Sequence, residues 1–214
     1  MPLVTMHQYI KKYPIKKTDK YLILGTIHPH LKAKVELDFF YGNTASLWKI
    51  LSDACSLELN NLENILTFLN DNNIAISDMI LNSTRENESK TQDSDLYDLD
   101  LNLELKEQIL KSNISTIFFT SAFSKNNAAK LFCKAFNVAT PKNWRENYEF
   151  DIQLEDKLLK GVILLSPSGS ANIGIANNKA YKSKQEEYKI YKTPIKQFKI
   201  DFYKDKFCKR INKK

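Results

Sequence analysis

Apolar and polar residues follow one another along the chain in blocks that predict alternating strands and helices. Four short, nearly continuous apolar runs, each bounded by turn-forming residues, have the pattern of buried parallel strands; they cover residues 21–26, 74–79, 116–121 and 162–165. Helical spacing of apolar residues lies between them, at residues 46–57, 61–70, 101–111 and 126–136. This alternation predicts an α/β fold, a three-layer α/β/α sandwich with a central four-stranded, mostly parallel sheet.

Three other segments extend this scheme. Residues 82–100 are polar and acidic, which predicts a surface loop or a mobile lid, and residues 141–157 contain aromatic residues without a clear period. Thr193 and Pro194 have the pattern of an N-cap and a first helical residue. An apolar stripe follows them, and we expect it to dock the final helix on the sheet; it consists of Ile195, Phe198 and Phe202.

Length and composition set the class of protein. The chain has 214 residues, of which 43% are hydrophobic and 27% charged, as expected for one folded domain over residues 1–214. No run approaches the roughly 18 apolar residues of a membrane span, and the first residues lack the apolar core of a signal peptide. We therefore expect a soluble, cytoplasmic monomer without a membrane partner.

The cysteines and histidines bear on redox and metal chemistry. Cys55, Cys133 and Cys208 are isolated and odd in number, which predicts free thiols. An iron–sulfur cluster usually needs four thiolates, and the three histidines lack the spacing of a zinc ligand pair. We therefore expect no metal and no cofactor.

Charge is distributed unevenly along the chain. The net charge is +7, but residues 1–100 hold 10 basic and 14 acidic residues, whereas residues 101–214 hold 22 and 11. Residues 179–214 are the most basic, with 13 basic and 4 acidic residues and several aromatics among them. Such a basic region is the footprint expected for phosphate backbones. A solvated basic helix in a lysine-rich composition is the alternative.

The first predicted strand ends in a loop that contains glycine, histidine and proline. Its residues are Gly25, Thr26, Ile27, His28 and Pro29. Glycine lets a chain turn off a strand, and proline stiffens the turn. Open α/β sheets bind ligands at the carboxyl edge of their strands, so His28 is a candidate for the chemistry. A structural role for this histidine is equally open.

An aromatic segment precedes the first predicted helix. Phe40 and Tyr41 form a candidate stacking platform for a flat ring, and Asn43 could bond a base edge or orient a water. The alternative is that Phe40 belongs to the core and that Asn43 is a turn or cap residue. Asp38, just before them, and Asp78, at the end of the second predicted strand, are further candidates for water activation or base contact.

A loop of small residues follows the last predicted strand. Small residues allow a backbone to approach a ligand, and hydroxyls and amides can hold phosphates. The loop is not a Walker loop, because the Gly-Lys-Ser/Thr ending is missing. The candidate residues are Ser166, Ser168, Gly169, Ser170 and Asn172.

The order of these segments resembles that of the uracil-DNA glycosylase superfamily, most of all its mismatch and hypoxanthine-type branch. The resemblance covers about residues 21–172. It rests on GTIHP, FFYGNTASLWKIL, a strand with Asp78 and its following loop, ISTIFFTSAFSKNNAAKLF, and LLSPSGSAN. The chain departs from the family pattern at His28, where Asp, Asn or an apolar residue is usual, and at Ala45, where an asparagine is expected.

The resemblance implies an enzyme that rotates a damaged nucleotide out of DNA and hydrolyses its glycosidic bond. His28 would lie in the catalytic slot, with Asp38 in reserve, and Asn43 would contact the base or the water. The base would be held by Phe40 or Tyr41 together with Asp78 and the first loop (Gly25, Thr26, Ile27 and Pro29). Ser166, Ser168, Gly169 and Ser170 would press on the DNA backbone, supported by Asn172.

The leading hypothesis is therefore a monofunctional DNA glycosylase for uracil or hypoxanthine, without a lyase step, because no lysine lies in the first motif. Its partner would be double-stranded or single-stranded DNA containing a damaged base. The runner-up is a nucleic-acid-binding module of the same fold with little or no catalysis. A small-molecule hydrolase is a third hypothesis, which accounts less well for the basic C-terminal region.

Overall fold

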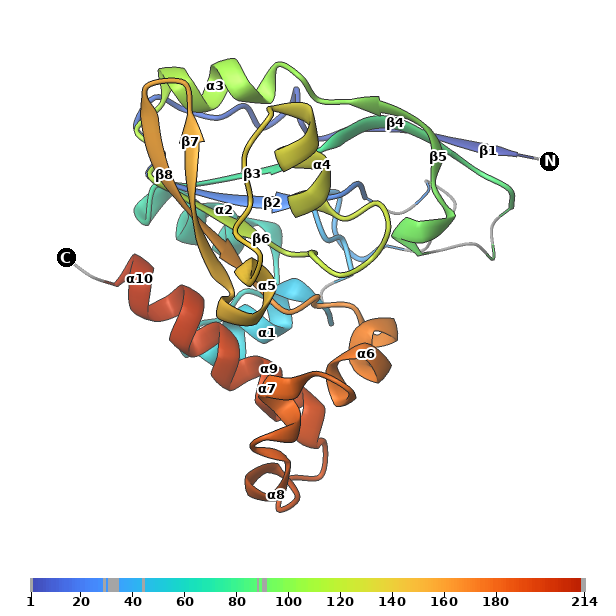
Figure 1. The fold of residues 1–214 in the computed structure, drawn as a ribbon, viewed down its shortest axis with the longest axis vertical. Coiled ribbons are helices and arrows are strands. Elements are labelled where there is room, and N and C mark those ends of the chain that lie inside the picture. Colours follow the sequence, from blue (N-terminus) through green and yellow to red (C-terminus); the bar gives the residue numbers. More distant parts are fainter. Residues whose placement is uncertain are drawn as a thin grey trace.

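The computed structural model describes residues 2–28, 30, 35–43, 45–87, 89 and 92–212. They form a mixed α/β structure with two sheets (Figure 1). The larger sheet has five strands in the order β3-β2-β6-β8-β7, with β2 parallel to β3 and β6, β6 parallel to β8, and β7 antiparallel at the edge. Their bounds are β2 Tyr21–Gly25, β3 Ile74–Asp78, β6 Thr116–Phe119, β7 Glu149–Leu154 and β8 Lys157–Ile163.

The mostly parallel sheet was predicted correctly, but its four-stranded size was wrong. The additional strand, β7, lies in the segment for which no period was recognised. Phe150, Ile152 and Leu154 are buried there and alternate with less buried residues, which is the period of two that a strand requires. β7 forms a hairpin with β8, which begins at Lys157 and so starts earlier than the predicted run at residues 162–165.

The smaller sheet replaces the predicted loop or lid at residues 82–100. It consists of β1 (Leu3–Met6), β4 (Ile80–Arg85) and β5 (Tyr97–Leu101), in the antiparallel order β1-β4-β5. β4 follows β3 after a single residue, Met79, whose N–H bonds to the Gly25 carbonyl. The polar composition concealed these strands, because no apolar run marks them and backbone pairing stabilises them, of β4 with β1 and of β5 with β4.

The four predicted central helices are present. They are α1 (Leu47–Cys55), α2 (Leu62–Asp71), α3 (Leu105–Lys111) and α4 (Ala128–Ala135). α3 begins later than predicted because residues 97–101 pair as β5. Short helices complete the described chain: η1 Asp93–Asp95, α5 Trp144–Asn147, η2 Gly169–Ala171, α6 Asn172–Ala176, α7 Lys179–Lys182 and α8 Gln185–Tyr188.

The C-terminal helix docks on the sheet, as predicted. It runs through α9 (Pro194–Tyr203), a π-helical turn (Lys204–Cys208) and α10 (Lys209–Ile211). Phe207, which lies outside the predicted apolar stripe, packs on Phe118 of β6 with ring centroids 4.6 Å apart, whereas Phe198 and Phe202 of the stripe pack on Tyr188 and Tyr148. The next residue of β6, Phe119, instead packs on Phe132 of α4 at 5.4 Å. Successive strand residues point to opposite faces, so the C-terminal helix and α4 cover opposite faces of the sheet.

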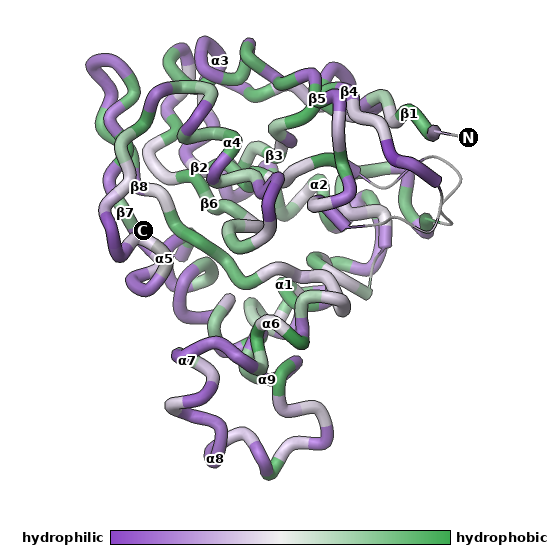
Figure 2. Tube along the Cα trace, turned by 45° about the vertical axis from the view of Figure 1, so that its right-hand side comes forward, coloured by the Kyte–Doolittle hydropathy of each residue, from purple (hydrophilic) through white to green (hydrophobic). Residues whose placement is uncertain are grey.

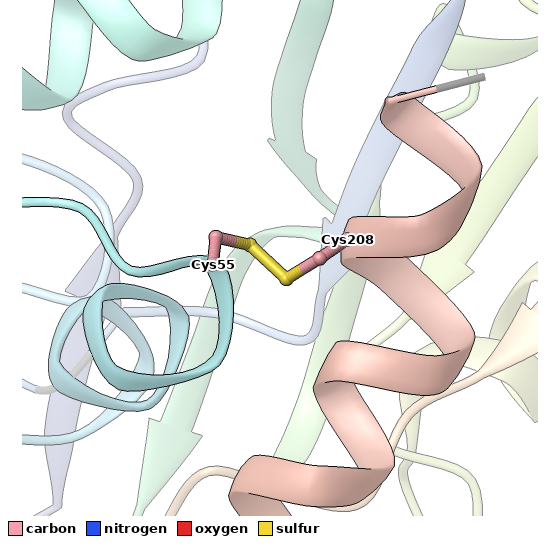
Figure 3. The surroundings of a disulfide bond; sticks show 2 residues. All are labelled: Cys55 and Cys208. Carbon is pink, nitrogen blue, oxygen red and sulfur yellow. A yellow bond between two sulfur atoms is a disulfide. The ribbon is translucent and has the colours of Figure 1, made fainter.

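A disulfide bond joins the end of α1 to the C-terminal helix (Figure 3). Cys55 and Cys208 are bonded with Cα atoms 5.6 Å apart, so the prediction of free thiols was wrong for this pair. Cys133 is a buried free thiol, as predicted. Spacing gave no signal for the bond, because the two cysteines are separated by 153 positions and meet only when the C-terminal helix docks beside α1.

Hydropathy differs between the body and the C-terminal projection. The strands of the larger sheet form an apolar centre, whereas α7 and α8 lie in a mainly hydrophilic segment that projects away from the body (Figure 2). Lysines of this segment are exposed, and the Lys179 side chain is 90% exposed. In the part of the chain that the structure describes, no helix is long and apolar enough to cross a membrane.

Candidate functional site

A cavity of about 280 Å³ lies where the parallel strands end. The carboxyl ends of parallel strands meet at one edge of a sheet, which is where open α/β folds bind ligands. The loop after β2 contributes to its wall together with residues from β3, the end of β6, the loop after β8 and the turn before α1. The lining includes Thr26, Ile27, His28, Tyr41, Asn43, Asp78, Asp93, Thr120, Ser121, Ser166, Ser168 and Gly169.

The cavity joins most of the candidate residues, although they come from segments up to about 140 residues apart. Nine of the fifteen candidates line it, and they represent the first loop, the aromatic segment, β3 and the serine-rich loop. Gly25 lies directly behind it. Asp38, Phe40, Ser170 and Asn172 are not part of its lining. Pro29 lies outside the described residues.

Asp38 and Phe40 are placed away from the cavity by their packing. The Asp38 carboxylate is 71% exposed and pairs with Lys12 at 3.0 Å; the hydrogen bond from Lys12 lowers the pKa of Asp38. Phe40 is fully buried, its ring packs on Phe39 and His7, and its carbonyl accepts a bond from Trp48 Nε1. Neither side chain is in position to touch a ligand in the cavity, so the expected roles of both residues are not supported by their location.

Gly25 is required because a larger residue would not fit at this position. Its backbone is not in the left-handed region, so the expected role in turning the chain does not apply. A Cβ atom at this position would overlap the Asp78 carboxylate and the Tyr41 hydroxyl. The glycine therefore lets two polar side chains approach the end of β2 closely, and these two side chains line the cavity.

Tyr41 is held in an uncommon conformation. Its φ is 52°, in the left-handed region that bulky residues rarely adopt. Its hydroxyl donates to Thr120 Oγ1 at 2.5 Å, because Thr120 itself donates to the Leu24 carbonyl. Burial, followed by the nearby Asp78 carboxylate, raises the pKa of Tyr41 well above its ordinary value. Tyr41 is therefore a neutral, fixed phenol, and strained backbone of this kind is concentrated at functional sites.

Asp78 is oriented by His7, a residue from the N-terminal segment. His7 Nδ1 accepts the backbone N–H groups of Tyr9 and Ile10, so the ring proton lies on Nε2, which donates to Asp78 Oδ2 at 2.8 Å. The side chains of this pair are only 1% and 5% exposed. The pair is thus a rigid part of the cavity wall, since a buried carboxylate needs a partner of this kind.

His28 also bonds to the N-terminal segment. Its Nε2 lies 3.3 Å from the Gln8 N–H and 3.2 Å from the Met6 carbonyl. Its ring packs edge-on against His7, with centroids 4.8 Å apart, and it is 6% exposed. His28 therefore lines the cavity while Nε2 is directed at backbone groups, which fits a wall residue better than a base that abstracts a proton.

Asn43 lies at the mouth of the cavity and shapes the turn into α1. Its Oδ1 accepts the Ala45 N–H at 3.0 Å, and its carbonyl accepts bonds from the Ser46 N–H and hydroxyl. The side-chain oxygen is thereby engaged in the turn. The amide NH₂ is the group of Asn43 that a ligand in the cavity would meet.

Asp93 is the carboxylate with the most unusual environment. Its Oδ2 accepts the Thr26 hydroxyl at 2.9 Å, and Thr26 in turn is 3.0 Å from the Ser121 hydroxyl. Burial raises the pKa of Asp93 to about 6, although the Thr26 bond acts in the opposite direction. A partly buried carboxylate with a pKa near neutrality is a candidate general base.

The serine-rich loop is fixed from below by a buried lysine. Lys199 of α9 is 3% exposed, and its Nζ donates to the Ser168 carbonyl at 2.8 Å. Burial lowers the pKa of Lys199 to about 8. The hydroxyls of Ser168 and Ser170 bond to each other at 2.8 Å on the exposed side of the loop. Asn172 begins α6 behind the loop, and its Oδ1 is buried without a hydrogen-bond partner among the described residues.

Sequence reasoning missed three contributors to the site: His7, Asp93 and the hydroxyl pair at the end of β6, Thr120 and Ser121. Asp93 carried a weak signal, since it lies in the loop that resembles a family motif. His7 carried none, because only the pairing of β1 with β4 brings it to Asp78.

The arrangement can bind a neutral, flat polar ligand and deliver a carboxylate to it. The wall supplies hydroxyl, amide and carboxylate groups at fixed positions. Among the described residues, no three His, Cys, Asp or Glu side chains are grouped so that they could hold a metal ion. No family model matches the chain, and no curated protein is significantly similar to it. Any functional assignment therefore rests on the geometry of this cavity.

Proposed function

We propose that this protein is a monofunctional DNA glycosylase of the uracil-DNA glycosylase type, which excises deaminated bases such as uracil or hypoxanthine. One observation carries the proposal. Five sequence segments that resemble the family, and that lie as far apart as Thr26 and Gly169, line one cavity at the carboxyl edge of the sheet. The helices on both faces of the sheet support the three-layer arrangement that the family would have.

In this proposal the flipped base occupies the 280 Å³ cavity. The Tyr41 hydroxyl, whose proton goes to Thr120 Oγ1, would accept a bond from its edge, and the Asn43 amide NH₂, held by the turn before α1, would donate one to it. Bonds of this kind favour the reaction when they strengthen as negative charge develops on the departing base. Asp78, whose carboxylate is held by His7, would form the wall of the base pocket at the end of β3.

Asp93 would act as the general base. A water on its carboxylate would attack C1′ of the sugar, the bond from C1′ to the base nitrogen would break, and Asp93 would take the proton of the water. The base would leave with the electron pair of that bond. Of the described residues that line the cavity, none is a lysine, which supports hydrolysis without a Schiff base.

The charge of the C-terminal region supports DNA as the partner. Residues 179–214 hold 13 basic and 4 acidic residues, and the segment of α7 and α8 projects from the body below α6 (Figure 1). Lysines placed there would contact phosphates, and such contacts make affinity fall steeply with salt. Ser168 and Gly169 would touch the backbone at the target nucleotide. The reaction needs neither metal nor cofactor, and one chain suffices.

A cytoplasmic location follows from this proposal, because the substrate would be cellular DNA. Cytoplasmic thiols are kept reduced, so the disulfide gives a direct test of location. Differential alkylation of Cys55 and Cys208 in intact cells should find both as thiols, with the disulfide forming only after the protein leaves the reducing cytoplasm. A complete disulfide in growing cells would contradict the cytoplasmic location.

The activity is tested with oligonucleotides that carry one uracil, hypoxanthine or xanthine, in single strands and duplexes, followed by alkaline cleavage of abasic sites. We expect strand breaks with at least one of these bases and none with the undamaged strand. Asp93→Asn should abolish them, whereas Asp95→Asn is the matched control, since Asp95 shares the turn η1 but does not line the cavity. No strand break with any base at protein excess would refute the proposal.

The second candidate is a nucleic-acid-binding module without catalysis. It is favoured by the placement of His28, whose Nε2 is directed at backbone groups although it occupies the usual catalytic slot. This alternative predicts that the protein binds undamaged DNA with an affinity that falls with salt and that it produces no strand breaks in the cleavage assay. Cleavage that depends on Asp93 would exclude it.

A further inference from the structure

A second, larger cavity adjoins the proposed base pocket. Its volume is about 530 Å³, which lies within the roughly 300–1,000 Å³ range of ligand sites. The two cavities share four lining residues: Asp93, Ser121, Ser166 and Ser168. A single deaminated base in the smaller cavity would leave this space unused, so the reaction as proposed above does not account for it.

The walls of the larger cavity are suited to a flat, uncharged ligand. Its apolar lining includes Ala122, Leu165 and Ile175, which are 0%, 1% and 5% exposed. Hydroxyl and amide side chains complete the lining. Of the described residues that line it, Asp93 alone is charged, so an anion such as a free phosphate would be repelled. An apolar surface with a few polar groups is the usual composition of a site for a ring system.

Phe123 provides an exposed aromatic face in this cavity. It follows Ala122 after β6 and is 49% exposed although it lines the cavity. Its ring lies 6.4 Å from that of Tyr148, which packs on Phe202 at 4.8 Å and donates its hydroxyl to Asn178 at 2.9 Å. The aromatic ring is therefore braced from behind by a fixed neighbour. All nucleobases can stack on such side chains, so stacking depends little on which base is present.

We propose that the larger cavity binds the base of the nucleotide next to the target on the same strand, stacked on Phe123. The proposal rests on the proposed glycosylase function and specifies its substrate. The strand would cross between the cavities over the loop of residues 166–170, where Ser168 and Ser170 present their hydroxyls and Lys199 holds the loop from below. The target base and the base next to it both leave the stack in this arrangement, so the substrate is single-stranded or locally opened DNA.

The proposal is tested by binding of single-stranded oligonucleotides with one target base. Three strands are compared: one with normal neighbours, one with an abasic tetrahydrofuran residue on the 5′ side of the target and one with it on the 3′ side. Affinity is measured by fluorescence anisotropy with the Asp93→Asn form, which leaves the target base attached to its sugar. Phe123→Ala is introduced in this form, and Leu158→Ala is the control, since Leu158 is 66% exposed and lies near the amino end of β8.

Loss of the neighbouring base on one side should weaken binding about 5-fold or more, because a base–aromatic stack contributes roughly 1–3 kcal/mol. Phe123→Ala should weaken binding of the normal strand by a similar factor and should then be insensitive to loss of that base. Leu158→Ala should retain the full dependence. Equal dependence on the neighbouring base with and without Phe123 would overturn the proposal.

The two proposals fail in distinguishable ways. Strand breaks with wild-type protein, but no coupling between Phe123 and a neighbouring base, would overturn the second subsite and leave the glycosylase function standing. Coupling in the binding assay without any strand break would refute the glycosylase function and support a second base-binding subsite in a catalytically inactive module.

Discussion

Replacing Asp93 with asparagine should abolish activity and at the same time stabilise the fold. The carboxylate bonds to Thr26 Oγ1 at 2.9 Å and lines both cavities. Burial raises its pKa from 3.8 to about 6, so the ionised form that a general base needs is unfavourable in the folded protein. Asparagine keeps the shape and an acceptor for Thr26 but cannot accept the proton of water. We expect kcat/KM to fall by about 10²-fold or more.

The gain in stability follows from the pKa. A rise from 3.8 to about 6 corresponds to about 3 kcal/mol of stability that the protein has below pH 3.8 and loses as pH rises through 6. An uncharged amide in place of the Asp93 carboxylate would avoid this loss, so at pH 8 the variant should be more stable by up to about 3 kcal/mol, or roughly 6–12 °C in Tm. Near pH 4 the difference should disappear, because wild-type Asp93 is then protonated.

Two measurements test this reasoning. Thermal unfolding of both proteins at pH 4, 6 and 8 gives the stability difference, and the wild-type pH–rate profile should rise about tenfold between pH 5 and 7 as Asp93 ionises. Asp95→Asn, on the same turn, should change neither result. An Asp93→Asn variant that is as active as wild type, or less stable at pH 8, would show that Asp93 is a structural carboxylate and not the base.

Three further predictions concern the supports of the site. Reduction of the Cys55–Cys208 bond, which spans 153 positions, should lower the free energy of unfolding by about 2–5 kcal/mol, seen as a lower Tm in reductant; Cys55→Ser should be insensitive to reductant, and an unchanged wild-type Tm would contradict the bond. Gly25→Ala should displace the Asp78 and Tyr41 side chains, cost about 1–3 kcal/mol in chemical unfolding and reduce kcat; full activity would disprove the space requirement. Lys199→Met removes the donor to the Ser168 carbonyl and should raise KM about 2- to 10-fold with little change in kcat; an unchanged KM would show that the loop holds its shape without the lysine.

Local pattern was sufficient for much of the fold. The strands β2, β3 and β6 and the helices α1, α2 and α4 were predicted because each is apolar on the face or faces that it buries. The start of the C-terminal helix was readable from Thr193 and Pro194, since proline fixes a first helical turn. β4 and β5 were missed because their polar residues are ordered by pairing between segments distant in sequence, β4 with β1 and β5 with β4.

The sequence by itself also determined which loops follow the strands, and a parallel sheet must bring such loops to one edge. That is why Thr26, Tyr41, Asn43, Asp78 and Ser168 could be named in advance and are found in one cavity. Only the tertiary structure decided which of the polar groups face that cavity. It directs His28 Nε2 to backbone groups and turns Phe40 into the core, and it brings Asp93 from a polar segment to the Thr26 hydroxyl. Side-chain direction and pKa depend on neighbours distant in sequence, because burial and hydrogen bonding are properties of the packed structure.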